Sequence, residues 1–400
     1  MNDLHDVAVI GAGPGGSATA HYLAQRGLKV LLLDKAQFPR DKTCGDGLTP
    51  RAVGVLQDMG LADDLKRAGH IIKRFEVFAP NGNSVRDAIT VHAGLPDYAL
   101  VVPRFTLDER IRDRAVQSGA TFMQAQVVEL QRVNSYVTLT VERAGKAETV
   151  QARIAVIASG ASTRLLLQAG ILQQQPRVMV ASRAYFENVA GLSDIWTLRF
   201  DDVPMPGYGW VFPAGDGLAN IGVGYFKEGR DASAANPFKQ FIASKAVRAM
   251  LANAKQVGPL KGYPLRDDFL TSPTFGDGAL LVGEAAGLVN PLTGEGIDYA
   301  LESGRIAAQC VAGMFEAGDF SHAQFTAYDA SLRAHFQALF EFCFKVRALC
   351  LKPLVLNTLV AMANRRADLR QRLVSVVLGG APVQGKLTLG RVMKALVRKH

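Results

Sequence analysis

The sequence is poor in cysteine, and this scarcity excludes two kinds of small stabilised site. Its 400 residues contain 4 cysteines, widely scattered and without a Cys-x-x-Cys pair. Neither a disulfide framework nor a zinc site is expected, and no metal-binding residues are predicted. Long apolar runs and a signal-type N-terminus are also missing, since no uninterrupted stretch reaches the roughly 18 residues of a spanning helix. These absences predict a cytoplasmic protein.

The net charge of +9 is unevenly distributed along the chain. Basic residues concentrate from Lys345 to His400, where the only acid is Asp368. Residues 386–400 (KLTLGRVMKALVRKH) place Leu and Val roughly on one side and basic residues elsewhere. This pattern suits an anionic membrane surface, although an ordinary surface helix or a frayed end would share it. We therefore expect peripheral membrane contact through the tail. No nucleic-acid partner is expected, because no recognition module is apparent.

The N-terminus has the layout of a dinucleotide-binding unit. Residues 6–10 (DVAVI) read as a buried strand, 15–26 as a helix and 29–33 (KVLLL) as a second strand. Between the first strand and the helix lies the glycine turn Gly11–Gly16, of the form G-x-G-x-x-G. A strand, a glycine turn, a helix and a second strand within about 30 residues predict a Rossmann-type βαβ unit.

Each glycine of this turn has a predicted task. Gly11 permits the tight turn, Gly13 lets the backbone approach a phosphate, and Gly16 allows close packing of helix on strand. The free N–H groups of the helix N-terminus then face the pyrophosphate of a cofactor. Asp34, at the end of the second strand, is placed to accept hydrogen bonds from a ribose diol.

A second glycine-rich segment lies near residue 290. In GALLVGEAAGLVNPLTGEGIDYALESG, residues 278–304, an apolar strand leads to Glu284. The loop Thr293–Gly296 then opens another helix and resembles a nest of N–H groups suited to an anion or a flavin carbonyl. We assign Gly294 to the cofactor site. The alternative is a strand, turn and helix whose glycines serve packing alone.

The pairing of these two motifs resembles the flavin-dependent group that contains aromatic hydroxylases, flavin halogenases and geranylgeranyl reductases. Three further stretches are similar to the geranylgeranyl reductase family. They are FPRDKTCGDGLTP at 38–50, VPRFTLD at 102–108 and PGYGWVFPAGD at 206–216. The resemblance runs from about residue 6 to 310 and leaves the basic tail outside it.

The resemblance implies FAD as the cofactor and a set of residues that contact it. These are Gly15, Asp34, Gly45, Gly47, Arg104, Val128, Glu284, Gly296 and Ile297. Arg104 is suited to donate to the pyrophosphate or to polar groups of the flavin. In the family the loop that holds Cys44 lies beside the flavin ring. Cys44 is therefore a candidate catalytic residue that tunes the flavin or donates a proton, or else a small residue that fits beside the ring.

Three aromatic residues alternate in the last of these stretches. Tyr208, Trp210 and Phe212 share one face if the segment is a strand. They suit the apolar wall of a pocket for a polyprenyl chain, and core packing of a sheet is the alternative interpretation.

The predicted fold is α/β, with a Rossmann-type FAD-binding domain, an inserted β-rich substrate domain of the aromatic-hydroxylase kind and a helical C-terminal tail. The FAD-binding domain is expected to be discontinuous. Its expected parts are 1–70, 101–170 and 275–335, with 71–100 and 171–274 in the substrate domain and 336–400 in the helical basic region. No oligomeric state is predicted.

The function predicted from the resemblance is the reduction of carbon–carbon double bonds in a prenyl lipid or prenylquinone, with hydride from N5 of the reduced flavin. A flavin monooxygenase or halogenase is an alternative, with Lys73 somewhat where a halogenase lysine would be expected. A flavin dehydrogenase is another, and a non-catalytic flavin module a third. Glu284 stands where the group usually has Asp. Ser159-Gly160 replaces a usual Asp-Gly that in hydroxylases is linked to both FAD and NADPH contacts, and this change argues against direct docking of NADPH. NADPH bound in another mode, a ferredoxin and a quinol all stay open as electron donor.

Overall fold

The computed structural model describes residues 4–90, 94–226 and 234–379. Its first sheet runs in the order β17-β18-β11-β1-β2-β8, and β9 and β10 extend it through β11 as antiparallel neighbours. These strands are β1 (His5–Ile10), β2 (Val30–Asp34), β8 (Thr121–Gln124), β9 (Gln126–Val133), β10 (Tyr136–Arg143), β11 (Lys146–Ile157), β17 (Phe275–Gly276) and β18 (Ala279–Leu281). The predicted α/β fold is confirmed, and the centre of this sheet is parallel.

The sequence pattern explains why the centre of this sheet is parallel. Residues 7–10 of β1 (VAVI) and 30–33 of β2 (VLLL) are continuous apolar runs with buried side chains, as strands covered on both faces require. They pair in parallel with Val7 opposite Val30, and β1 pairs with β11 on its other side. The connection between β1 and β2 is α1 (Pro14–Ala24), which packs against α8 (Ile297–Ala317). The predicted strand–turn–helix–strand unit is therefore present.

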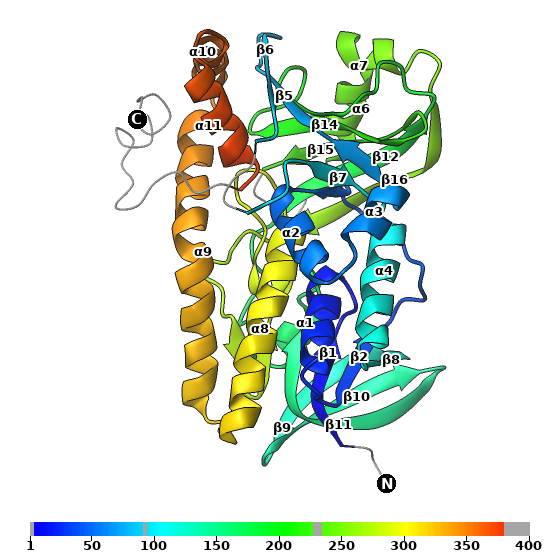
Figure 1. The fold of residues 1–400 in the computed structure, drawn as a ribbon, viewed down its shortest axis with the longest axis vertical. Coiled ribbons are helices and arrows are strands. Elements are labelled where there is room, and N and C mark those ends of the chain that lie inside the picture. The colour runs from blue at the N-terminus through cyan, green and yellow to red at the C-terminus, as the bar shows by residue number, and fades with distance from the viewer. Residues whose placement is uncertain (1–3, 91–93, 227–233, 380–400) are drawn as a thin grey trace.

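A second, seven-stranded sheet lies at the opposite end of the molecule from the β9–β10 pair (Figure 1). Its order is β16-β12-β15-β14-β13-β5-β6. The strands are β5 (Arg74–Phe78), β6 (Ser84–Ala88), β12 (Met179–Glu187), β13 (Ile195–Arg199), β14 (Gly207–Gly215), β15 (Leu218–Tyr225) and β16 (Lys255–Leu265). The parallel pairing of β13 with β5 joins segments that are more than 100 residues apart in the chain.

The two faces of this sheet have different neighbours. One carries Val211 and Ile221, which form a core with Phe238 and Phe241 of α6 (Ala235–Ala243), next to α7 (Lys245–Met250). The other carries the aromatic side chains of β13 and β14 and forms a separate core. A small sheet has the strand order β3-β7-β4 and contains β3 (Gly47–Leu48), β4 (His70–Ile72) and β7 (Ala99–Val101). Strands β4 and β7 contact β14 of the second sheet.

Helices complete the fold. Helices α2 (Pro50–Asp58) and α3 (Ala62–Ala68) contact the small sheet. Helix α4 (Arg104–Gln117) packs on α1, α5 (Arg164–Gln168) on β9, and the short 3-10 helix η1 (Gly283–Ala286) on α8. The C-terminal part contains α9 (His322–Cys350), α10 (Pro353–Arg365) and α11 (Ala367–Val377). Helices α8 and α9 run side by side (Figure 1). The expected limit of the C-terminal region, between residues 335 and 336, lies inside the continuous helix α9.

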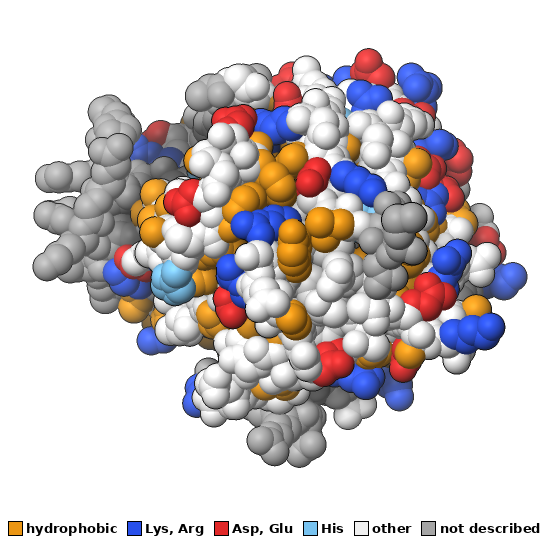
Figure 2. Space-filling model, turned by 90° about the horizontal axis from the view of Figure 1, so that it is seen from below, with side chains coloured by type: hydrophobic (Ala, Val, Ile, Leu, Met, Phe, Trp, Pro, Cys, Tyr) orange, Lys and Arg blue, Asp and Glu red, His pale blue; other side chains and the backbone are white. Residues whose placement is uncertain are grey.

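The expected tail segment 386–400 lies outside the described residues. Within the described ranges, no single helix is long and apolar enough to cross a membrane. The pair α9 and α10 passes that test by length and composition only when taken together, and it is bent by 106°. Figure 2 shows Lys and Arg interspersed with acidic and hydrophobic side chains on the face seen from below. The described residues on that face therefore show no single-sign charged patch.

Candidate active site

A cavity of about 650 Å³ extends from the carboxyl ends of β1 and β2 to the aromatic face of the second sheet. Its wall includes nearly every residue that the sequence assigned to the site. The assigned residues that line it are Gly11, Gly13, Gly15, Asp34, Cys44, Gly45, Gly47, Arg104, Val128, Tyr208, Trp210, Phe212, Glu284, Gly294, Gly296 and Ile297. Gly16 is the exception, because it lies beneath the turn against the carbonyl of Gly11.

The glycine turn forms one end of the cavity. Gly11 has a φ of +110°, a conformation that residues with a Cβ rarely adopt. Helix α1 then begins at Pro14 without a side-chain cap on Gly13, so its first N–H groups have no side-chain acceptor there. Arg40, which the sequence interpretation did not assign, brings Nη2 to 3.4 Å from the position of a Cβ on Gly13. A helix N-terminus and a guanidinium at one place suit a pyrophosphate.

Asp34 is fixed at the end of β2 by two backbone donors. Its Oδ2 accepts from the Ala12 amide at 2.8 Å, and its Oδ1 accepts from the Ala36 amide at 2.8 Å. Each carboxylate oxygen keeps lone pairs for another donor, as a ribose diol requires. Val128, on β9, lines the same part of the cavity.

Glu284 is buried in η1 and contacts two other segments, those that hold Arg266 and Lys42. Its Oε1 accepts from the Arg266 amide at 3.1 Å, and its Oε2 lies 3.3 Å from the Nζ of Lys42. The longer side chain in place of the usual Asp therefore has a cationic partner, and sequence reasoning did not find that partner. Ser159 and Gly160 line the cavity beside this pair, with the Nζ of Lys42 3.2 Å from the position of a Cβ on Gly160.

The loop of Cys44 is held against the second sheet. The amide of Asn220, on β15, donates to the carbonyl of Cys44 at 2.7 Å. Burial raises the pKa of Cys44 to about 11, although the nearby Arg104 acts in the opposite direction. The side chain is therefore a thiol at neutral pH, not a thiolate. Gly47 leaves no room for a side chain unless the Trp196 ring moves, since a Cβ there would lie 1.8 Å from that ring.

Arg104 is almost fully buried at the start of α4 and is bound to Asp108. Its Nε and Nη2 donate to the two carboxylate oxygens, each at 2.7 Å. Arg40 reaches the same carboxylate, with its Nη2 2.9 Å from Oδ2. That Arg104 contacts the cofactor stays a prediction. In the structure Arg40 approaches Gly13 of the glycine turn, whereas Arg104 lies beside Cys44.

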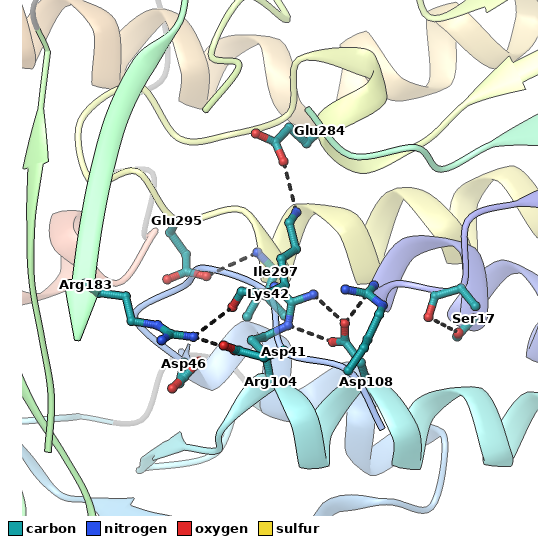
Figure 3. A network of polar contacts seen from close by, with 12 residues as sticks. Ser17, Asp41, Lys42, Asp46, Arg104, Asp108, Arg183, Glu284, Glu295 and Ile297 are labelled. Carbon is teal, nitrogen blue, oxygen red and sulfur yellow. Dashed lines mark hydrogen bonds and ion pairs between the residues drawn. The ribbon is translucent and has the colours of Figure 1, made fainter. Parts of the chain in front are cut away.

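The start of α8 differs from the expected open nest. The loop has its turn at Gly294, with a φ of +69°. Here Oε1 of Glu295 accepts from the backbone N–H of Ile297 at 3.2 Å (Figure 3). It also accepts from the N–H of Gly296 at 3.2 Å. The sequence interpretation left these N–H groups free for an anion or a flavin carbonyl. It missed that a carboxyl from the same loop binds them.

The aromatic residues of β14 form the other end of the cavity. Tyr208, Trp210 and Phe212 lie in one core cluster with Trp196 of β13, and all four line the cavity. The hydroxyl of Tyr208 donates to the carbonyl of Thr293. Nε1 of Trp210 donates to Oδ1 of Asn220 at 2.9 Å. The two interpretations of this strand are therefore compatible, because the same side chains pack as a core and face the cavity.

Further lining residues at this end come from distant segments. They are Phe75 of β5, Trp196 and Leu198 of β13, and Val377 and Leu378 at the end of α11. No local motif marks them. They reach the cavity through the parallel pairing of β5 with β13 and through the packing of α11 against β6.

Comparison with known proteins decides the family. A family model described as FAD binding domain matches residues 5–342. The chain belongs to this FAD-binding family. Within it, the chain is 37% identical over 319 residues to menaquinone reductase of Mycobacterium tuberculosis, covering 77% of each protein. It is 30% identical over 385 residues to digeranylgeranylglycerophospholipid reductase 1 of Methanopyrus kandleri, covering 92% of this chain and 96% of the relative.

Solved structures agree in fold with this FAD-binding protein. A geranylgeranyl bacteriochlorophyll reductase-like protein of Thermoplasma acidophilum aligns with a TM-score of 0.81 at 23% identity, covering 100% of this chain and 97% of that one. A flavin-dependent brominase aligns at 0.78 and 22% identity, covering 95% and 94%. At these identities the likeness shows the fold alone. The family model, the relatives and this shared fold together confirm the resemblance to the geranylgeranyl reductase family. They also confirm that the chain is an FAD-dependent oxidoreductase.

The residues present fit FAD. The flavoprotein offers an uncapped helix N-terminus and Arg40 for the pyrophosphate, and a carboxylate at Asp34 for a ribose. By contrast, Lys73, the candidate of the halogenase alternative, is about half exposed. Its Nζ lies 3.6 Å from Asp97 and 5.4 Å from the centre of the Tyr98 ring. Lys73 is not among the residues that line the described cavity.

Proposed function

We propose that this flavoprotein reduces carbon–carbon double bonds in the prenyl chain of a quinone or lipid. The single observation that carries the proposal is the composition of the cavity. It begins at the glycine turn and ends on a wall of Trp196, Tyr208, Trp210 and Phe212. The relatives named menaquinone reductase and digeranylgeranylglycerophospholipid reductase support a prenyl substrate.

The polarity of the aromatic end supports an apolar substrate. Hydrogen bonds to Thr293 and Asn220 already occupy the Tyr208 hydroxyl and the Trp210 N–H. The rings therefore present mainly hydrocarbon surface to the cavity, which favours a polyprenyl chain over a charged small molecule.

The chain's own residues would position the reactants. Bound FAD supplies hydride from N5 of its reduced ring. The glycines of the 45–47 loop let the aromatic side chains approach closely, with the Phe212 ring 3.0 Å from a Cβ position on Gly45. The wall would hold one double bond in place and keep out water, and a protein acid would supply the proton.

The test is anaerobic reoxidation of photoreduced enzyme, which is measured as the return of the oxidised flavin spectrum. Geranylgeranyl lipids and menaquinone with an unsaturated side chain should reoxidise the flavin. A lipid with a fully saturated side chain is the matched control and should leave it reduced. Because a quinone ring accepts electrons directly, the menaquinone product must also be examined for loss of a side-chain double bond. A strict need for oxygen, with oxygen or halogen in the product, would refute the proposal.

A further inference from the structure

The start of α8 holds an acid that the proposed reduction has not yet used. Glu295 belongs to the loop between η1 and α8 and lines the cavity together with Cys44 and Tyr208. Its backbone is fixed on both sides. The Asn290 amide donates to the Glu295 carbonyl at 2.7 Å, and the Glu295 amide donates to Oγ1 of Thr293 at 3.3 Å. The carboxyl therefore has a defined place in the cavity wall.

The two oxygens of this carboxyl have different surroundings. Oε1 accepts from the N–H groups of Gly296 and Ile297, as a carbonyl oxygen does. Among the described residues, Oε2 makes no hydrogen bond. A carboxylic acid whose carbonyl oxygen is bound and whose hydroxyl is unengaged is arranged to donate its proton into the cavity.

The charges around Glu295 favour the neutral form. Burial raises its pKa well above the ordinary range, and the neighbouring carboxyl of Asp298 raises it further. The N–H groups of Gly296 and Ile297 and the charge of Arg104 act in the opposite direction but are outweighed. Cys44 and Tyr208, the other titratable groups that face it, add no positive charge.

Asp298 strengthens this bias because it is buried on the first turn of the same helix. Oγ1 of Thr49 donates to its Oδ2 at 2.5 Å, and burial raises the pKa of Asp298 to about 7. Asp298 is buried and Glu295 is half-buried in the cavity wall. Two carboxyls at one helix start disfavour double ionisation, so the pair retains a proton near neutral pH.

We propose that Glu295 is the catalytic acid of this site and that it protonates one carbon of the prenyl double bond. The inference rests on the proposed function. In the step, the alkene π bond breaks. Hydride from the reduced flavin forms one C–H bond and leaves the flavin oxidised. The Glu295 proton forms the other C–H bond and leaves a carboxylate, which regains its proton from water.

Cys44 is the competing donor, and its environment makes it the poorer acid. Its pKa of about 11 means that donation would leave a thiolate in a buried position. General acids work best when their pKa lies near the working pH. Donation from Glu295 instead leaves a carboxylate that still accepts from the N–H groups of Gly296 and Ile297, so Glu295 is the better placed donor and Cys44 is a small neighbour of the ring.

The test compares Glu295→Gln with Glu295→Asp, Cys44→Ala and the exposed surface control Glu148→Gln. Gln keeps an oxygen acceptor for Gly296 and Ile297 but has no acidic proton. In the FAD-loaded oxidised enzyme, infrared difference spectra should show the carbonyl band of a neutral carboxylic acid at neutral pH. Of the two variants that replace glutamate by glutamine, only Glu295→Gln should lose this carbonyl band.

The second readout is the rate at which a prenyl substrate reoxidises photoreduced enzyme. Glu295→Gln should slow it by about 10²- to 10⁴-fold with FAD content unchanged. The wild-type rate should fall as pH rises through the Glu295 pKa, and Glu295→Asp should keep such a fall. Three outcomes would overturn the role of Glu295 as catalytic acid and leave the proposed function intact. They are a carboxylate band of Glu295 at neutral pH, a Glu295→Gln enzyme with the full rate, and loss of proton transfer in Cys44→Ala alone. Wild-type enzyme that leaves alkenes intact would overturn the proposed function and the role with it.

Discussion

The guanidinium of Arg40 lies 2.9 Å from the carboxylate of Asp108. This ion pair connects the glycine turn with α4. Arg40 also reaches Gly13, and Asp108 holds the buried Arg104 through two hydrogen bonds. One fully buried carboxylate therefore fixes two arginines, one at the expected pyrophosphate position and one beside Cys44.

Asp108→Asn should destabilise the protein strongly. The substitution leaves Arg104 buried without its anionic partner, and breaking a buried pair in this way costs about 3–5 kcal/mol. Denaturant unfolding measures the loss, and FAD titration should show weaker binding because Arg40 is released as well. Asp113→Asn, on the same helix but more exposed, is the control and should change either quantity little. Equal effects of the two variants would contradict this account.

Gly47→Ala should disturb the aromatic wall. A Cβ at this position would overlap the Trp196 ring, so the ring must move, at a cost of about 1–3 kcal/mol. Thermal unfolding and the tryptophan fluorescence spectrum report the two changes. Gly313→Ala, on α8 with nothing within 4 Å of its Cβ position, should be neutral or slightly stabilising. An unchanged Gly47→Ala protein would mean that Trp196 does not pack over the loop.

Asp46 should make stability depend on pH. It is fully buried, and burial raises its pKa to about 6. The hydrogen bonds that Tyr185 and Asn220 donate to it lower the pKa but are outweighed. Because the folded pKa is raised above the ordinary value, the stabilising contribution is complete below pH 4 and is lost as pH rises towards 6. The full effect is on the order of 3 kcal/mol.

Asp46→Asn removes this titration and keeps an oxygen that accepts from Tyr185 and Asn220. Urea unfolding at pH 5 and at pH 8 should therefore show a smaller difference for the variant than for the wild-type protein. The same pH difference in both proteins would assign the titration to another group.

We also propose peripheral association with membranes from the cytoplasmic side, through the basic segment 386–400. Removal of residues 386–400 should reduce cosedimentation with vesicles that contain anionic lipid. Binding to neutral vesicles should be weak for both forms, and salt should weaken binding of the full chain. Undiminished binding of the shortened chain to anionic vesicles would show that another surface makes the contact.

Local patterns were enough to predict residues that the structure brings together at one end of the cavity. The glycine turn and Asp34 lie within one strand–helix–strand unit, so their spacing along the chain defines their spacing in the fold. Trp196 and Leu378 could not be found in this way, because sheet pairing and helix packing bring them to the cavity from distant segments.

Glu295 shows a different limit of sequence reasoning. Its position in the second glycine motif was evident, and its loop was correctly expected to open a helix. Whether its side chain points to solvent or back onto the N–H groups of α8 depends on the local backbone and on burial by neighbouring segments. Arg40 is similar, since it lay inside a quoted motif but became a candidate only through its distance to Gly13.

The central claim is most directly tested by mass spectrometry of the product of one anaerobic turnover of photoreduced enzyme with an unsaturated prenylquinone. We expect a product that has gained two hydrogens in the side chain and has one double bond fewer there. After any quinol has been reoxidised, its quinone ring should be unchanged. A product whose side chain keeps all its double bonds would contradict prenyl reduction. So would a reaction that proceeds only when oxygen or halide is supplied and that adds oxygen or halogen to the product.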